Sequence, residues 1–430
     1  MALGFGVVIA TGTLLLSLPI ASQSGQPVAV IDALFTATSA TAVTGLVTVD
    51  TQTTYSLFGE LVILALIQTG GLGFMTLSTL VALLLGKRIT LKERLVMQEA
   101  MNQLTVEGVV RLSKYVLIFT LFAEGLGALL LSIRFSSQMP LGQAIYFGIF
   151  HAVSAFCNAG FDLFSKSLVD YRGDLLVNMV ITLLIIFGGL GFSVVADIYT
   201  KRSWKRLSLH SKIVIRTTLL LIVTATVIIF LLEYTNTKSL APLPLGEKIL
   251  ASYFQAVTPR TAGFNTLVIG DLRPVTLLFI TILMFIGASP GSTGGGIKTT
   301  TFAAIAVAVW TIIRGNVDIE VFGRRLPRGT VLKALAIAAV SLLLVVTVTG
   351  ILLITEQADL QMVLFEVTSA FGTVGLSMGL TPKLTTTGKL LITATMFTGR
   401  VGPLTLAFAI AQRLGRQGIK HYPEERIIVG

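Results

Sequence analysis

Residues 365–376 read FEVTSAFGTVGL, and three earlier stretches of the chain repeat the same pattern. The earlier copies are FTATSATAVTGL at 35–46, FHAVSAFCNAGF at 150–161 and FQAVTPRTAGF at 254–264. Each copy is rich in Ala, Ser, Thr and Phe and ends in a glycine followed by an apolar residue. Recurrence of one unit at four places predicts a fold built from internal repeats.

A glycine-rich centre within an apolar stretch follows each copy, 24 to 28 residues after its anchor glycine. The centres are QTGGLGF (68–74), FGGLGF (187–192), GASPGSTGGGIK (287–298) and TGRVGPL (398–404). A membrane-spanning helix is also predicted before each copy, at 3–20, 115–133, 213–233 and 331–354. Each unit is therefore a helix, a re-entrant segment and a second helix.

The predicted fold class is an all-α membrane protein with eight transmembrane helices and four re-entrant pore helices around a central pore. Unit 1 covers 1–86, unit 2 with a preceding cytosolic segment covers 87–200, unit 3 covers 201–316 and unit 4 covers 317–412. The remaining residues, 413–430, form a cytosolic C-terminal tail. An even number of crossings places both termini on the same side.

Composition places the chain in a membrane. Hydrophobic residues make up 53% of its 430 residues and charged residues only 12%, whereas soluble domains carry about 25% charged residues. Lys and Arg cluster between the units, at 87–114, 201–216, 314–333 and 413–426, which the positive-inside rule assigns to the cytoplasm. We expect a multi-pass protein of the cell membrane, in contact with lipid, with cytoplasmic termini and without nucleic acid as a partner.

The re-entrant segments carry the predicted chemistry. Irregular backbone at membrane depth must line water or protein, and rings of carbonyl oxygens can replace the hydration shell of potassium. Glycine allows a positive φ and leaves no side chain on the axis. The predicted potassium-binding filter consists of the three residues ending at each anchor glycine: Val43, Thr44, Gly45, Asn158, Ala159, Gly160, Thr261, Ala262, Gly263, Thr373, Val374 and Gly375.

The stretch 287–296 is too rich in glycine, with a proline, to continue a helix. It is interpreted as an intramembrane loop that obstructs the pore, with a passive helix break as the alternative. A phosphate-binding loop is disfavoured because Ile297 stands where lysine is required. The predicted gate residues are Gly287, Ala288, Ser289, Pro290, Gly291, Ser292, Thr293, Gly294, Gly295, Gly296, Lys298 and Arg400.

Arg400 is an arginine at predicted membrane depth, where a charge is costly and usually functional. It is predicted to form an electrostatic barrier below the filter or to hold the gate loop through its carbonyls. A buried ion pair with Glu60 or Asp197 is the alternative. Lys298 closes the loop, and its long side chain can snorkel to the inner surface.

Two further residues beside the predicted filter are given structural roles. Arg260 is expected to satisfy carbonyls behind the filter or to pair with an outer acid. Cys157 is expected to be a small packing residue. The glycines of the first two centres are expected to allow close packing or bending of helices.

The motifs VTGL, NAGF, TAGF and TVGL, with GASPGSTGGGIK and Arg400, resemble the Ktr/Trk/HKT superfamily of potassium transporters over essentially the whole chain. The likeness is strongest to KtrB-type membrane subunits of bacterial Ktr systems. It implies passive, gated potassium uptake, often sodium-dependent, with the gate at 287–296. It also implies a homodimer with a cytosolic nucleotide-binding regulatory ring of the KtrA type. The ions implied are potassium and sodium, with no organic cofactor on this chain.

Two rival functions remain open. A symporter that couples sodium or protons to potassium uptake would need a titrating acid or a second ion site, for which Glu124, Asp197 and Glu233 are candidates. A membrane ATPase or transferase would use the glycine-rich stretch and Lys298. No catalytic constellation is visible, and one cysteine and three histidines cannot form a zinc site, so no enzyme activity is expected.

Overall fold

The computed structural model of the chain describes residues 2–73, 109–316 and 318–402, and within them the fold is almost entirely helical. One short hairpin is present, in which β1 (Glu320–Val321) pairs with β2 (Arg324–Arg325) in antiparallel register. The predicted cytosolic segment at 87–108 and the tail at 413–430 lie outside the described residues.

The helices can be taken in four consecutive groups along the chain. The first contains α1 (Ala2–Leu16), η1 (Pro19–Ala21), α2 (Val30–Ala42), α3 (Thr51–Thr54) and α4 (Leu57–Leu72). The second contains α7 (Val109–Phe135), α8 (Leu141–Phe156), η2 (Val169–Tyr171), α9 (Leu175–Gly189), α10 (Phe192–Lys201) and η3 (Trp204–Arg206). The third contains α11 (Leu209–Glu233), α12 (Leu245–Val257), η4 (Ile269–Asp271), α13 (Pro274–Phe285) and α14 (Thr299–Ile313). The fourth contains α15 (Arg328–Thr355), α16 (Leu360–Gly372), η5 (Thr381–Lys383) and α17 (Thr386–Val401).

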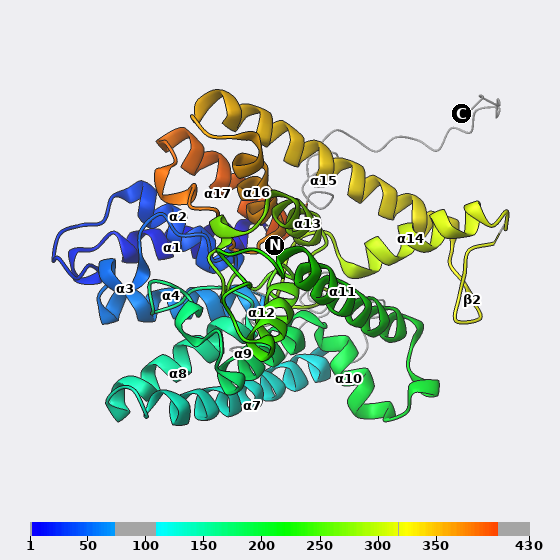
Figure 1. The fold of residues 1–430 in the computed structure, drawn as a ribbon, viewed down its shortest axis with the longest axis horizontal. Helices are drawn as coiled ribbons and strands as arrows, with labels where there is room; N and C mark the ends of the chain where they lie inside the picture. Colours follow the sequence, from blue (N-terminus) through cyan, green and yellow to red (C-terminus); the bar gives the residue numbers. More distant parts are fainter. Residues whose placement is uncertain (1, 74–108, 317, 403–430) are drawn as a thin grey trace.

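The four groups follow one another around a common centre, from blue through cyan and green to orange (Figure 1). The short helix of each group packs against the second helix of the preceding group. The contacting pairs are α8 with α4, α12 with α9, α16 with α13 and α2 with α17. The last pair joins the end of the chain to its beginning, and the arrangement is therefore closed.

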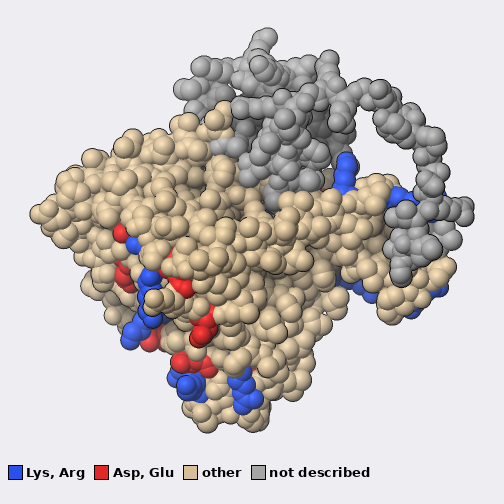
Figure 2. Space-filling view, turned by 90° about the horizontal axis from the view of Figure 1, so that it is seen from above, with Lys and Arg blue, Asp and Glu red and all other residues tan. Residues whose placement is uncertain are grey.

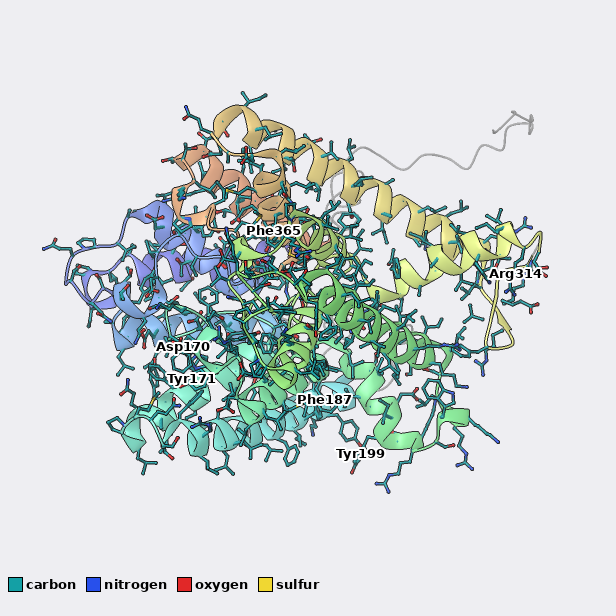
Figure 3. The ribbon with its side chains drawn as sticks, viewed as in Figure 1. Asp170, Tyr171, Phe187, Tyr199, Arg314 and Phe365 are labelled. Atoms are coloured by element: carbon teal, nitrogen blue, oxygen red, sulfur yellow. The ribbon has the colours of Figure 1, made fainter. Side chains whose placement is uncertain are left out.

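The repeated phenylalanine that opens each sequence copy lies in the core. Phe35, Phe150, Phe254 and Phe365 are all fully buried. Figure 3 shows Phe365 inside the bundle, whereas Tyr199 and Arg314 lie at its periphery. Large apolar side chains also cover much of the exterior, and charged side chains gather on limited parts of it (Figure 2). An apolar exterior is what a hydrocarbon environment requires.

Three described helices are long and apolar enough to cross a membrane: Ser113–Phe135, Leu209–Glu233 and Arg328–Thr355. A fourth candidate is the pair Leu175–Gly189 and Phe192–Lys201, which is bent by 95°. The predicted helices at 115–133, 213–233 and 331–354 lie within α7, α11 and α15. The first helix, α1, ends at Leu16 and is therefore shorter than predicted. Pro19 has no backbone N–H to donate within a helix, and it begins a 3₁₀ turn instead.

The glycine-rich centres interrupt or end helices, as their composition predicts. Gly191, with φ of 93°, marks the bend between α9 and α10. Gly73 and Gly402 follow α4 and α17 with φ of 81° and 94°. In the third unit no helix covers 286–298, and α14 begins only at Thr299. This non-helical segment brings its backbone into the middle of the fold.

Candidate functional site

The four short helices α2, α8, α12 and α16 lead into turns with one shared backbone conformation. Two residues before each anchor glycine, φ is positive: 58° at Val43, 59° at Asn158, 73° at Thr261 and 50° at Thr373. Positive φ is strained for β-branched residues. The anchor glycines Gly45, Gly160, Gly263 and Gly375 have φ of 88°, 70°, 83° and 90°. The four turns therefore share one backbone conformation at two positions.

The anchor glycines form a closed ring in which each faces the main chain of the next unit. A Cβ added to Gly160 would lie 2.7 Å from the carbonyl oxygen of Ala262, and one added to Gly263 would lie 2.7 Å from that of Val374. The same construction on Gly45 and Gly375 meets the carbonyl oxygens of Ala159 and Thr44. Only glycine fits at these four positions.

Each turn is closed by a main-chain hydrogen bond to a serine or threonine that lies in its own short helix or directly after it. In all four units, the backbone amide of the residue before the anchor glycine donates to the backbone carbonyl of that serine or threonine. The pairs are Thr44 to Ser39 (2.8 Å), Ala159 to Ser154 (2.7 Å), Ala262 to Thr258 (3.0 Å) and Val374 to Ser369 (2.8 Å). The amides of the turns therefore bond within their own unit, and the carbonyl groups remain available.

The two residues before each anchor glycine are completely buried in all four units. Within the described part of the chain, their carbonyl oxygens accept no hydrogen bond. Buried carbonyl groups are almost always paired, and those that are not need a specific explanation. Four of these oxygens, those of Thr44, Ala159, Ala262 and Val374, lie beside the anchor glycines of the ring. Carbonyl oxygens are the ligands that a desolvated potassium ion requires.

Side chains brace the ring from behind. With its amide nitrogen turned toward the carbonyls of Ala155 and Ile185, both at 3.2 Å, Asn158 accepts from the Thr261 hydroxyl at 3.1 Å. This places a bridge between the turns of units 2 and 3. In unit 1, the Ser39 hydroxyl accepts from the Gly45 amide at 3.1 Å. A serine or threonine recurs five or six positions before each anchor glycine, and this pattern in the sequence indicates the residue that closes each turn.

The non-helical segment 286–298 lies directly against these turns. The Gly295 amide donates to the Thr373 hydroxyl at 3.0 Å, and the Thr293 hydroxyl donates to the Phe156 carbonyl at 3.3 Å. A Cβ on Gly294 would collide with the Thr261 side chain. Units 2, 3 and 4 therefore all contact this segment just behind the ring.

The segment is also docked on the bend between α9 and α10. The amides of Ser289 and Thr293 donate to the carbonyls of Gly189 (3.0 Å) and Gly188 (3.2 Å), and the Phe192 amide donates to the Gly291 carbonyl at 2.9 Å. Its two ends meet through a bond of 2.8 Å from the Gly287 amide to the Ile297 carbonyl. The segment is thus a compact loop seated in the broken helix of unit 2.

Two cationic side chains hold this loop. The Arg400 guanidinium donates to the carbonyls of Thr293 and of Gly70 on α4. Lys298 donates from Nζ to the Gly294 carbonyl at 2.8 Å. Arg400 therefore makes one of the contacts predicted for it, a bond to a loop carbonyl, and the Lys298 side chain bonds within the loop that it closes.

The alternative ion pairs of Arg400 are not formed. Glu60 accepts from the Tyr146 hydroxyl, and Asp197 pairs with Lys201 at 2.7 Å. The predicted partners of Arg260 are also absent from the described residues. Its side chain is buried, and Nε donates to neither a filter carbonyl nor an outer acid. These partners depend on contacts between distant units, which local sequence does not report.

Cys157 is fully buried and packs against Gly71, in agreement with its predicted packing role. Its Sγ lies 3.5 Å from Gln68 Oε1 and 3.8 Å from Glu124 Oε1. Glu233 binds the Arg273 amide at 2.9 Å and the Ser239 hydroxyl, and it thereby joins α11 to the start of α13. Among the three acids considered for coupling, Glu233 and Asp197 thus have structural partners.

The chain is similar to known cation transport proteins. Residues 4–420 match the TrkH family, described as cation transport protein. The chain is 48% identical to the Ktr system potassium uptake protein B of Bacillus subtilis, covering all of this chain and 96% of that protein. It is 40% identical to the potassium/sodium uptake protein NtpJ of Enterococcus hirae, with the same coverage. Its fold matches the potassium transporter TrkH from Vibrio parahaemolyticus with a TM-score of 0.76 at 18% identity, over 97% of this chain and 86% of that one.

Proposed function

The chain belongs to the TrkH family of cation transport proteins, and we propose that it is the ion-conducting subunit of a Ktr-type potassium uptake system. One observation carries the proposal: a closed ring of four glycine turns presents buried carbonyl oxygens that accept no hydrogen bond from the described residues. The strong likeness to a potassium uptake protein, at 48% identity over the full chain, supports the same ion.

In this proposal a potassium ion sheds water at the ring and binds carbonyl oxygens from all four units. The carboxyl ends of α2, α8, α12 and α16 lead into the ring, and their partial negative charge favours a cation there. The wider architecture proposed is eight crossings with four re-entrant pore helices. Both termini are placed in the cytoplasm by the positive-inside rule.

The loop 287–296 is proposed to be the gate. It lies just behind three of the four turns and is held by Arg400 and Lys298. Opening then requires the loop to release the Arg400 guanidinium and leave the bend of α9 and α10. The proposed trigger is a KtrA-type nucleotide-binding ring that docks on the basic cytoplasmic segments of a homodimer, as the resemblance to KtrB-type subunits implies. The name of the relative, Ktr system potassium uptake protein B, describes one protein of a larger system.

A second candidate, symport of sodium or protons with potassium, is favoured by Glu124. This carboxylate is buried in the span Ser113–Phe135 and accepts from Gln68 Nε2 at 3.1 Å and from the Cys157 thiol. No cationic side chain pairs with it among the described residues. Symport predicts that uptake stops when sodium and the pH gradient are both removed, and that Glu124→Gln abolishes the coupling.

Rubidium flux into proteoliposomes tests the main proposal, with wild type compared with Gly160→Ser and Gly263→Ser. We expect flux driven by the ion gradient alone in wild type, and a reduced or less selective flux in both variants. Gly350→Ser is the matched control, because nothing lies within 4 Å of a Cβ at Gly350. If both ring variants conduct rubidium as fast as wild type, the four turns do not line the conduction path.

A further inference from the structure

Two adjoining cavities lie on the outside of the fold. The first lies at the end of α7, at η2 and at the starts of α9 and α12, and the second lies between α9, α11 and α12. The first has a volume of about 660 Å³ and is lined by polar and charged residues that include Arg134, Asp170 and Arg172. The second has a volume of about 830 Å³ and is mostly apolar. Gly173, Leu175 and Glu247 line both cavities, so the polar site opens directly into the apolar groove.

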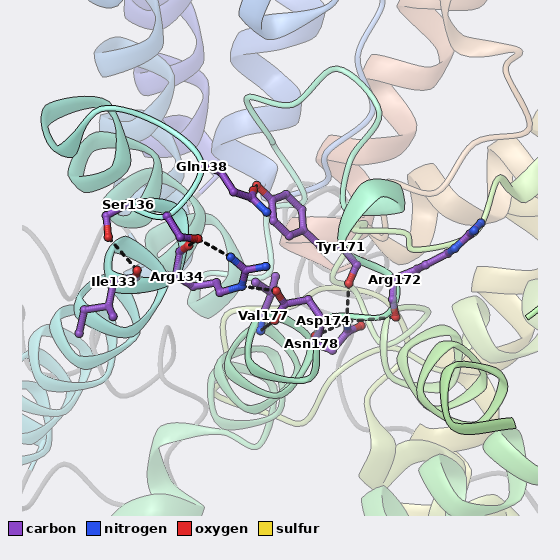
Figure 4. A network of polar contacts seen from close by, with 10 residues as sticks. Ile133, Arg134, Ser136, Gln138, Tyr171, Arg172, Asp174, Val177 and Asn178 are labelled. Carbon is purple, nitrogen blue, oxygen red and sulfur yellow. Dashed lines mark hydrogen bonds and ion pairs between the residues drawn. The ribbon is translucent and has the colours of Figure 1, made fainter. Parts of the chain in front are cut away.

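Two of the charged side chains that line the polar cavity already bond to other residues of the chain. Arg134 pairs with Asp174 and donates to the Ser137 hydroxyl at 2.6 Å. Asp174 also caps α9 by accepting from the Val177 amide at 3.0 Å. Figure 4 shows this network, with the Arg172 side chain extending away from it. The pair Arg134–Asp174 is therefore structural.

The remaining charges of the cavity are poorly paired. Arg172 Nε lies 3.9 Å from Glu247 Oε2, and the two side chains are 47% and 35% exposed. Asp170 is exposed and has no hydrogen bond or ion pair within the described chain. The mouth of the cavity thus offers one guanidinium and two carboxylates to a ligand. This set complements a group that carries one negative and one positive charge.

The apolar groove has the dimensions of an acyl-chain site. Leu219, Val223 and Val227 recur at every fourth residue of α11 and are 61%, 52% and 52% exposed. They cover about 12 Å along the helix at 1.5 Å per residue. Ile249 of α12 and Leu175 of α9 lie on the same groove, 51% and 64% exposed.

We propose that the two cavities together bind one phosphatidylethanolamine molecule. Its phosphate binds Arg172, its primary ammonium binds Glu247 and Asp170, and one acyl chain lies in the groove along α11. An anionic lipid is disfavoured because the cavity holds three carboxylates against two guanidinium groups. Phosphatidylcholine is disfavoured because its quaternary ammonium has no N–H to donate to a carboxylate. The bound lipid would link the loop before α9 in unit 2 to the pore helix α12 in unit 3.

Native mass spectrometry and thermal unfolding of the full chain in detergent test this site. Phosphatidylethanolamine, phosphatidylcholine and phosphatidylglycerol with identical acyl chains are titrated separately. We expect a retained lipid and a raised unfolding midpoint with phosphatidylethanolamine alone. The double variant Asp170→Asn, Glu247→Gln should bind it about tenfold more weakly, the loss expected for hydrogen bonds to a charged group. Asp359→Asn, an exposed acid elsewhere on the chain, is the control.

Val223→Trp provides a second variant, because it fills the exposed groove without changing a charge. It should also abolish the retained lipid while the fold and rubidium flux persist. Stronger binding of phosphatidylglycerol, or equal binding of phosphatidylethanolamine by wild type and both variants, would overturn the proposal. A change in oligomeric state with Val223→Trp would instead assign the groove to a second copy of the chain, and would equally overturn it.

Discussion

The ring of anchor glycines and the loop 287–296 touch each other but are held in different ways. Each turn of the ring is closed by hydrogen bonds within a few residues of its own short helix, and the pattern occurs four times. The loop occurs once, and its partners Gly188, Thr373 and Arg400 come from two other units, units 2 and 4. Local, repeated bonds fix the ring, whereas the loop depends on distant groups that can separate without unfolding a helix.

This difference is consistent with the proposed roles of the ring as a filter and of the loop as a gate. Opening a turn of the ring would cost bonds inside a helix end and would break a closed circle of close main-chain contacts. Releasing the loop costs mainly the bonds of two cations and a few amides.

The largest effect is expected from Gly375→Ala in the ring. Its Cβ would meet the Thr44 carbonyl, and φ is 90°. A left-handed alanine costs about 1–2 kcal/mol, and overpacking adds about 1–3 kcal/mol. Rubidium flux should fall at least about tenfold, with a lower unfolding midpoint in detergent. Gly379→Ala is the control, because Gly379 also has a positive φ but a Cβ there would meet no atom within 4 Å. Normal flux in Gly379→Ala together with lost flux in Gly375→Ala would attribute the loss to the contact within the ring. Equal flux loss in both variants would contradict the ring argument.

An intermediate effect is expected from Arg400→Gln at the loop. The change removes charged donors to Thr293 and Gly70, each such bond contributing about 1.5–3 kcal/mol. Flux in the absence of any regulatory partner should therefore rise about tenfold, the opposite direction to the ring variant. Lys389→Gln is the control, because this cation lies on the same helix but pairs with Asp32. Unchanged or reduced flux in Arg400→Gln would show that the loop does not limit conduction.

The smallest effect is expected from two matched serines behind the ring. The Ser39 hydroxyl accepts from the Gly45 amide at 3.1 Å, whereas the equivalent Ser369 hydroxyl has no partner in the described structure. Ser39→Ala should lower the free energy of unfolding by about 1 kcal/mol, and Ser369→Ala should leave it nearly unchanged. The selectivity for rubidium over sodium is measured in both variants, and it should fall in Ser39→Ala but not in Ser369→Ala. Equal losses in the two variants would mean that the units are more alike than their side-chain bonds indicate.

The same distinction explains how much could be predicted from sequence. The four turns and the break at 286–298 were predictable because glycine and proline act on the backbone locally. The sequence predicts too long a first helix, because Pro19 stands within an apolar stretch and yet ends the helical run before it. The partners of Arg260 and Arg400 depend on which units become neighbours, and of the contacts predicted for them only the bond from Arg400 to a loop carbonyl is formed. Arg260 has neither of its expected partners among the described residues.

The contact between α2 and α17 has a consequence for biosynthesis. The two helices pack together, and Lys389 pairs with Asp32 at 2.6 Å, although more than 340 residues separate α2 from α17. At about 5–20 residues per second, a ribosome needs roughly 20 to 70 seconds to make that interval. During this time α2 lacks its neighbour α17. The closed arrangement of the four groups can therefore form only after α17 has been made.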